Sequence, residues 1–189
     1  MDALDLLTAD HNRVRGLFEQ FQEAKENDDT PQMRELAEKI FFELEVHTEI
    51  EEKVFYPGIK DLEEEISEEV AEGLEEHHVV DVLMEEAKDL EPGDEQWVAK
   101  LIVIIESVEH HASEEEQEMF PEVRKVTDEA KRNEWGERME QLKAEHGAPT
   151  PSDAERLTTE ELKKLASEQH IPNRSKMTRD DLVATVDAR

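Results

Sequence analysis

The sequence contains no cysteine, and this absence removes several kinds of chemistry at once. It excludes a disulfide framework, a thiolate nucleophile and a metal site built on cysteine sulfur. Aromatic residues are also scarce, with a single tyrosine, and only six glycines and seven prolines interrupt the chain. The residues that dominate are Glu, Lys, Ala and Leu, which favour helices over strands. The composition therefore predicts an all-α fold.

Long apolar runs are missing as well. The longest, Leu101–Ile105, is far shorter than the roughly 18–20 residues that cross a bilayer. The first ten residues, MDALDLLTAD, form an acidic amphipathic pattern and lack the features of a secretory signal. We therefore expect a cytoplasmic protein that does not contact membranes.

Positive charge is in short supply, because 22 Lys and Arg residues face 52 Asp and Glu residues. The formal net charge of −30 disfavours binding of a nucleic-acid backbone by the main part of the chain. Most of the acidic residues are expected on solvated helix faces. A salt-rich cytoplasm would screen their mutual repulsion, which makes such a host our expectation.

Apolar periodicity and breakers divide the chain into helices. Thr30 is expected to cap the second helix, with Pro31 at its first position. The second and fourth helices are expected to end at aromatic-proline pairs, near Tyr56-Pro57 and Phe120-Pro121. The expected helices cover residues 3–26, 30–55, 62–90, 94–120 and, more weakly, 127–145.

Four long helices with short connections predict an up-down-up-down four-helix bundle. We assign residues 1–145 to this bundle and its trailing helix. Residues 146–154 form a Pro/Gly-rich linker, and residues 155–189 form a small helix-loop-helix module.

A repeat marks the second and fourth helices. Residues 47–57 read HTEIEEKVFYP and residues 111–121 read HASEEEQEMFP, so each copy has a His followed four residues later by a Glu. On a helix these two side chains share one face. The expected apolar seams of the other two helices also contain one His each, His11 and His77. The third seam runs through Leu74 and Asp81 in this interpretation.

Burying these polar side chains without compensation would cost several kcal/mol for each carboxylate. A lone seam histidine is usually a core residue with a partner, but four such seams favour a metal site, since imidazole and carboxylate are natural ligands. His11 and His47 lie 36 residues apart, and His77 and His111 lie 34 apart. This internal repeat predicts two metals related by a pseudo-two-fold axis.

The segments DHNRVRGLF, ELEVHTEIEEKVFYP, EEHHVVDVLM and VEHHASEEEQEMFP resemble the four helices of hemerythrin-like, HHE cation-binding domains. The resemblance covers about residues 3–125. It implies a four-helix bundle around an oxo- or hydroxo-bridged centre of two iron ions. The metal ligands that it implies are His11, His47, Glu51, His77, His111 and Glu115, with the two Glu residues as bridges.

The chain departs from the oxygen-carrying hemerythrins at Asp81, where they have a fifth His. Asp81 is expected to be a further ligand or a hydrogen-bond acceptor for one. His78, His110 and Glu52 neighbour the implied ligands and are expected to flank them. The repeated Glu-x-x-His pairs of ferritin-like sites and the His-Glu-x-x-His motif of zinc proteases are not found.

Three functions remain open at this point. The first is a di-iron protein that senses or handles dioxygen, nitric oxide or iron in a stress response. The second is an enzyme that uses the same centre to reduce peroxide or nitric oxide, or to repair iron centres. The third is a metal-free helical adaptor. The cellular metal stays open as well, because zinc and manganese accept most of these ligands.

The C-terminal segment resembles the small helix-loop-helix of SAP-like and Rho-termination-factor N-terminal domains. From residue 152 onward it has seven basic and eight acidic residues. Capping boxes are expected at Thr158 with Glu161 and at Thr178 with Asp181. The module is expected to be a docking or spacer unit, with nucleic acid as the alternative partner. The residues for such a contact are Lys163, Lys164, Arg174, Lys176 and Arg179.

Overall fold

The computed structural model describes residues 1–148, 157, 159–168, 171, 174 and 177–187, and their regular structure is helical throughout. None of the helices in these ranges is both long and apolar enough to cross a membrane. The elements are α1 (Ala3–Glu26), α2 (Thr30–Ile50), η1 (Glu51–Phe55), α3 (Tyr56–Ile59), α4 (Glu64–Lys88), α5 (Glu95–Glu114), η2 (Glu115–Met119), α6 (Phe120–Val126), α7 (Glu129–Glu145), α8 (Thr159–Glu168) and α9 (Arg179–Asp187).

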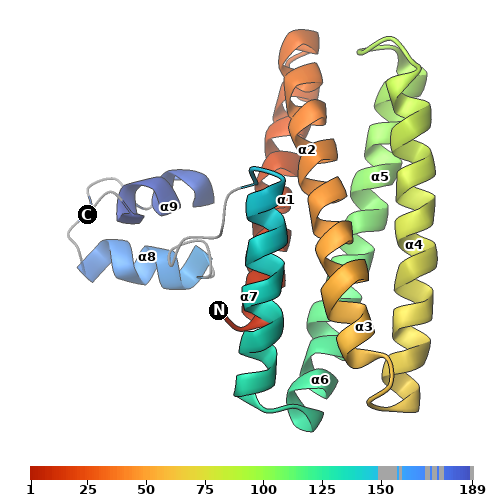
Figure 1. Cartoon of the computed structure of the whole chain (residues 1–189). Helices are drawn as coiled ribbons and strands as arrows, with labels where there is room; N and C mark the ends of the chain where they lie inside the picture. The colour runs from red at the N-terminus through yellow and green to blue at the C-terminus, as the bar shows by residue number, and fades with distance from the viewer. Residues whose placement is uncertain (149–156, 158, 169–170, 172–173, 175–176, 188–189) are drawn as a thin grey trace.

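Four long helical rods form an antiparallel bundle, which confirms the predicted all-α fold class (Figure 1). Helix α1 packs along α2, and α4 packs along α5. The second helix is capped one residue earlier than expected, because the Asp29 side chain accepts a hydrogen bond from the Gln32 N–H. Asp94 stands at the N-cap of α5, as predicted.

The second and fourth rods do not stop at their aromatic-proline pairs, so this expectation is wrong. Each passes through a π-helical turn, η1 or η2, and continues as α3 or α6. The Tyr56 N–H donates to the Glu51 carbonyl, and the Phe120 N–H donates to the Glu115 carbonyl, five residues back. A π turn inserts one extra residue, so the rod accommodates the proline that follows, which has no N–H to donate.

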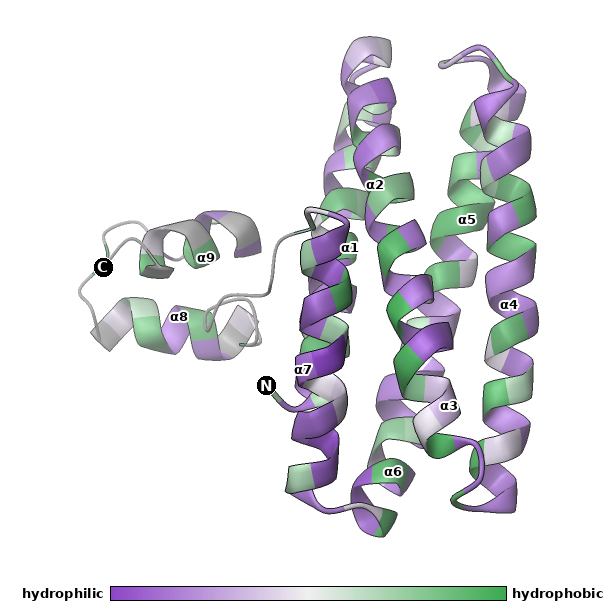
Figure 2. Cartoon of the chain, viewed as in Figure 1, coloured by the Kyte–Doolittle hydropathy of each residue, from purple (hydrophilic) through white to green (hydrophobic). Residues whose placement is uncertain are grey.

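Two apolar clusters fill the bundle, one toward each end. One contains Phe18, Phe21 and Trp97, and the other contains Leu4 and Phe55. On every rod a histidine lies between the residues of the two clusters. Figure 2 shows the corresponding mixture of apolar and polar residues along each rod. The bundle therefore has a polar layer between two apolar cores.

Helix α7, which is strongly polar overall, packs against α1, α2 and η1. Trp135 and Met139 complete the apolar cluster around Phe55. A Cβ atom placed on Gly58 would lie 2.7 Å from the Trp135 ring, so the indole rests directly on this glycine. Helix α7 is therefore an integral part of the fold.

The C-terminal helices α8 and α9 pack on each other around a small core of their own, which includes Leu162, Ile171 and Leu182. Thr178 and Asp181 exchange side-chain to backbone hydrogen bonds of 3.0 and 3.2 Å, the capping box expected from the sequence. Thr158 of the other expected box lies outside the described residues. The likeness to SAP-like modules and the domain boundaries stay predictions.

Replacing Trp135 with alanine tests the contribution of α7. The side chain is 2 % exposed, so we expect Trp135→Ala to lower the free energy of unfolding by about 3–5 kcal/mol. Phe42→Ala is the control, because Phe42 is 39 % exposed and its loss should cost less than about 1 kcal/mol. Urea denaturation measures both variants. Equal losses would contradict the packing described for α7.

Candidate metal centre

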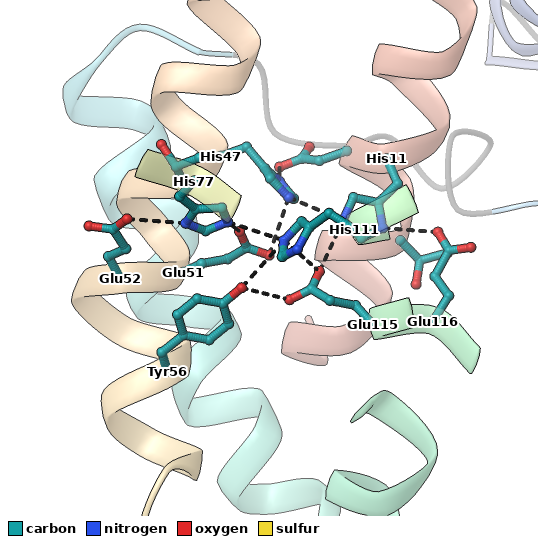
Figure 3. Close-up of polar contacts among 12 residues, drawn as sticks. His11, His47, Glu51, Glu52, Tyr56, His77, His111, Glu115 and Glu116 are labelled. Carbon is teal, nitrogen blue, oxygen red and sulfur yellow. Dashed lines mark hydrogen bonds and ion pairs between the residues drawn. The ribbon is translucent and has the colours of Figure 1, made fainter. Parts of the chain in front are cut away.

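Six ionisable side chains from the four rods meet in the polar layer (Figure 3). None is more than 7 % exposed. Each comes from the middle of a rod, where the apolar clusters above and below exclude water. They are His11 of α1, His47 of α2, Glu51 of η1, His77 of α4, His111 of α5 and Glu115 of η2.

The histidines form two pairs, one from each half of the bundle. The Nε2 atoms of His11 and His47 lie 3.1 Å apart, and those of His77 and His111 also lie 3.1 Å apart. The rings of each pair meet edge to face, with centroids 4.8 Å apart. Each pair therefore directs two ring nitrogens at one point.

The two glutamates connect these pairs. Glu51 lies between the halves, with Oε1 3.2 Å from His47 Nε2 and Oε2 3.3 Å from His77 Nε2. Glu115 Oε2 lies 3.3 Å from His11 Nε2 and 3.8 Å from His111 Nε2. Each carboxylate thus contacts a histidine of its own rod and one of the opposite half.

Comparison with known proteins gives this arrangement a family. The model of the family described as Hemerythrin HHE cation binding domain matches residues 2–123. The chain belongs to the hemerythrin HHE family. The match begins before α1 and ends within α6, and it includes all six converging side chains.

A curated relative extends the comparison beyond the HHE domain. A protein named DNA nickase, from Nostoc sp. (strain PCC 7120 / SAG 25.82 / UTEX 2576), is 25 % identical over 135 residues. The alignment covers 71 % of this chain but 37 % of the relative, so it spans little more than a third of that protein. No solved structure gave a significant match.

The six converging side chains fall into two groups small enough to hold a cation each. Within each group the donor atoms lie within 4.8 Å of one another. Glu51 belongs to both groups, which places its carboxylate between two candidate cation positions. One group is His11, His47, Glu51 and Glu115, and the other is Glu51, His77 and His111.

Four outer carboxylates face the Nδ1 atoms of the histidines; three lie within hydrogen-bond distance, whereas His47 Nδ1 makes no hydrogen bond. A proton on Nδ1 that donates to a carboxylate leaves the Nε2 lone pair directed inward, toward a cation. Glu52 was expected beside the ligands, whereas the other three were missed in the sequence. The Nδ1 to carboxylate distances are 2.9 Å for His11–Glu116, 3.8 Å for His47–Asp10, 3.1 Å for His77–Glu52 and 2.7 Å for His111–Glu76.

Tyr56 is a further site residue that the sequence did not predict. Its hydroxyl donates to Glu115 Oε1 at 3.0 Å, and its ring stacks on His77 with centroids 5.6 Å apart. Phe120, the equivalent residue of the second repeat, stacks in the same way on His11. The sequence predicts both residues at helix ends, whereas the structure places their rings against the histidines.

Buried carboxylate oxygens without hydrogen-bond partners indicate whether a cation fits this layer. Among the described residues, both carboxylate oxygens of Glu51 and the Oε2 atom of Glu115 are buried without a hydrogen-bond partner. Such atoms cost free energy unless another group compensates for their lost hydration. Oxygen and imidazole nitrogen donors are ligands that divalent cations accept. The residues therefore fit a bound metal.

Lys143 of α7 ties the fifth helix to the same layer. Its ammonium donates to Asp10 Oδ2 at 2.6 Å, and both side chains are 1 % exposed. Burial alone would lower the pKa of His47, but Glu51 and Asp10 outweigh it and raise this pKa to about 10. A protonated His47 is therefore the resting state of the metal-free layer near neutral pH.

Asp81 and two further histidines lie outside the group of six. The buried seam of α4 runs through Gly73 and Val80, one residue before the expected Leu74 and Asp81, so the predicted seam is wrong at these two positions. Its steps alternate between four and three residues, which leaves Asp81 exposed. The structure also leaves His78 and His110 exposed.

The C-terminal basic residues are placed only in part. Lys163 and Lys164 are exposed on α8. Arg174 donates to the carbonyl of Ile171 at 3.3 Å, and Arg179 donates to the carbonyl of Leu157 at 3.3 Å. Lys176 lies outside the described residues.

Cation binding to the metal-free protein should release protons at pH 7. The metal needs a neutral imidazole, and the pKa of His47 is raised to about 10, so its proton must leave. The apparent association constant for Zn²⁺ should therefore rise with pH between 7 and 9, about tenfold per unit for each proton displaced. A pH indicator in weak buffer measures the release. His47→Gln should release fewer protons and His146→Asn the same number as the native chain, and an affinity independent of pH would contradict the raised pKa.

Proposed function

We propose that this HHE protein holds two iron ions and uses them to bind dioxygen or nitric oxide as part of a stress response. The observation that carries this proposal is the sharing of Glu51 between two donor groups. One carboxylate that contacts a histidine of each half is suited to bridging two cations. Glu115, which also contacts both halves, would be the second bridge.

The donor set favours iron over a structural zinc ion. A closed zinc site takes four ligands around one ion, whereas six side chains shared by two ions leave coordination positions open. When bound, an iron pair supplies reversible binding of small ligands and one-electron chemistry. Protein side chains supply everything else, by positioning the ions and excluding water.

A small cavity beside the histidines supports a diatomic ligand. It measures about 20 Å³, and the apolar part of its wall comes from Leu44, Val80, Val108 and Ala112. A cavity of this size holds about one water-sized molecule. Its size excludes a larger substrate, and the apolar side chains beside the histidines suit a neutral diatomic molecule.

Turnover of peroxide or nitric oxide by the same centre is the second candidate. Tyr56 favours it, because a buried hydroxyl that donates to Glu115 holds a proton next to the paired histidines. Loss of added peroxide or nitric oxide over many equivalents would establish turnover. If the protein bound nitric oxide or peroxide without consuming it, the sensing function would be favoured over turnover.

The relative named DNA nickase raises nucleic acid as a partner, which we assign to the C-terminal module alone. The formal charge of −30 opposes contact through the bundle. The exposed Lys163 and Lys164 on α8 offer the positive charge that such contact needs.

Metal content tests the di-iron proposal directly. His47→Ala combined with His111→Ala removes one nitrogen from each pair, so the iron content should fall from two ions per chain toward zero. His78→Ala with His146→Ala is the matched control and should retain both ions. Elemental analysis of protein purified without added metal makes the comparison. Metal content near zero in all three proteins would support a metal-free adaptor instead, and two ions in all three would contradict binding by these histidines.

Nucleic-acid contact is tested by charge removal on α8. Lys163→Gln with Lys164→Gln should weaken binding to duplex DNA at low salt, and raising the salt should weaken binding of the native chain. Lys131→Gln with Lys125→Gln is the control on the bundle. Nicking of supercoiled plasmid by the native chain is measured in parallel. Identical DNA binding by both double variants would contradict a role for α8.

A further inference from the structure

An acidic pocket opens on the outside of α4, α5 and η2 and ends at the buried centre. Its volume is about 60 Å³. Its outer wall includes the carboxylates of Glu69, Glu72 and Glu118, and its inner wall includes His111 and Glu115. The Oε2 atom of Glu115 is buried without a hydrogen-bond partner. The pocket therefore joins exposed negative charge to an unpaired, buried carboxylate oxygen.

Gly73 leaves room for this pocket. A Cβ atom there would lie 2.8 Å from the Tyr56 hydroxyl and 3.2 Å from His111 Cε1. In the internal repeat, the residue of α1 that corresponds to Gly73 is Leu7, which is fully buried. In the first half of the bundle the Leu7 side chain thus fills the space that Gly73 leaves open in the second half.

Three side chains, which we call the mouth group, form a donor group of their own: Glu76 and Glu114 line the pocket, and His110 lines the adjoining surface hollow. Glu76, His110 and Glu114 each offer one ligand atom, and these atoms lie within 4.8 Å of one another. His110 is 66 % exposed, and its Nε2 atom lies 3.3 Å from Glu114 Oε1. Glu76 also reaches inward, because its Oε2 atom lies 2.7 Å from His111 Nδ1, within hydrogen-bond distance.

The mouth group repeats the inner donors one residue earlier on the same rod. His110 and Glu114 immediately precede His111 and Glu115, so each His and its Glu are four residues apart in both pairs. One pair faces the interior and the other faces the solvent. Glu76 connects the two pairs, because it belongs to the outer donor group and its carboxylate also contacts His111.

The first half of the bundle closes the equivalent position. The residues that correspond to His110 and Glu114 are Val46 and Ile50, which are buried and apolar. Asp10, which corresponds to Glu76, is neutralised there by Lys143 of α7. Both halves have equivalent inner donors. Among the equivalent positions compared, only those of the second half combine an open pocket with outer donors.

Uncompensated charge makes the pocket attractive to cations. Glu69 is partly buried, and its Oε2 atom has no hydrogen-bond partner among the described residues. Burial and then the neighbouring carboxylates of Glu118 and Glu122 raise its pKa. Carboxylates that repel one another in a cleft raise the local concentration of cations and their rate of binding.

We propose that Glu76, His110 and Glu114 form a surface site for a divalent cation, and that cations pass from it through the acidic pocket to His111 and Glu115. This entry route rests on metal binding by the buried centre, which it deepens.

The test measures the rate of metal loading in the full-length, metal-free protein. Co²⁺ is mixed with the protein in a stopped-flow instrument, and the visible absorbance of the bound ion is followed at low and high salt. His110→Asn with Glu114→Gln should load on the order of tenfold more slowly at low salt, with the difference shrinking as salt screens the charges. After a desalting column has removed weakly held surface ions, the final Co²⁺ content should match that of the native chain.

A matched control distinguishes this entry route from a general effect of the protein's negative charge on the loading rate. His146 and Glu49 form another surface pair, 2.7 Å apart, that does not line the acidic pocket. His146→Asn with Glu49→Gln should load at the native rate. The proposal would be overturned if the mouth variant loaded Co²⁺ at the native rate, or if the control slowed equally. A lower final Co²⁺ content in the mouth variant would overturn it as well. A native chain that binds no Co²⁺ would instead refute metal binding by the buried centre.

Discussion

The burial of six ionisable side chains between two apolar cores is the constraint on which the fold depends. Carboxylates with no hydrogen-bond partner, such as Glu51, oppose folding unless something compensates for their lost hydration. A cation compensates for it and links all four rods at once. The metal is therefore expected to act as a central part of the core, in the same position where a purely apolar bundle would have leucines.

The internal repeat extends beyond the six inner residues. Asp10 and Glu76 precede His11 and His77 and face the histidine of the neighbouring rod, while Glu52 and Glu116 follow Glu51 and Glu115 and face the opposite half. The π turns η1 and η2 lie at the same position in both halves. Differences between the halves are therefore informative: α7 covers one of them, and the acidic pocket opens in the other.

The sequence predicted the fold class and most helix bounds, because apolar periodicity and caps are local signals. It missed the π turns, since a proline usually signals an end and nothing local says that an extra residue will be accommodated. It placed Asp81 on the seam by copying the four-residue step of His47 and Glu51. Asp10, Glu76 and Glu116 were hidden among 52 acidic residues, although applying the repeat to Glu52 would have found Glu116.

The most direct measurement of the central claim is the position of the metal in a crystal of the iron-loaded protein. Anomalous scattering at the iron edge locates the ions independently of the protein atoms. The account predicts two peaks in the polar layer, one beside the His11–His47 pair and the other beside the His77–His111 pair, with Glu51 between them. A single peak, or peaks only on the protein surface, would contradict it.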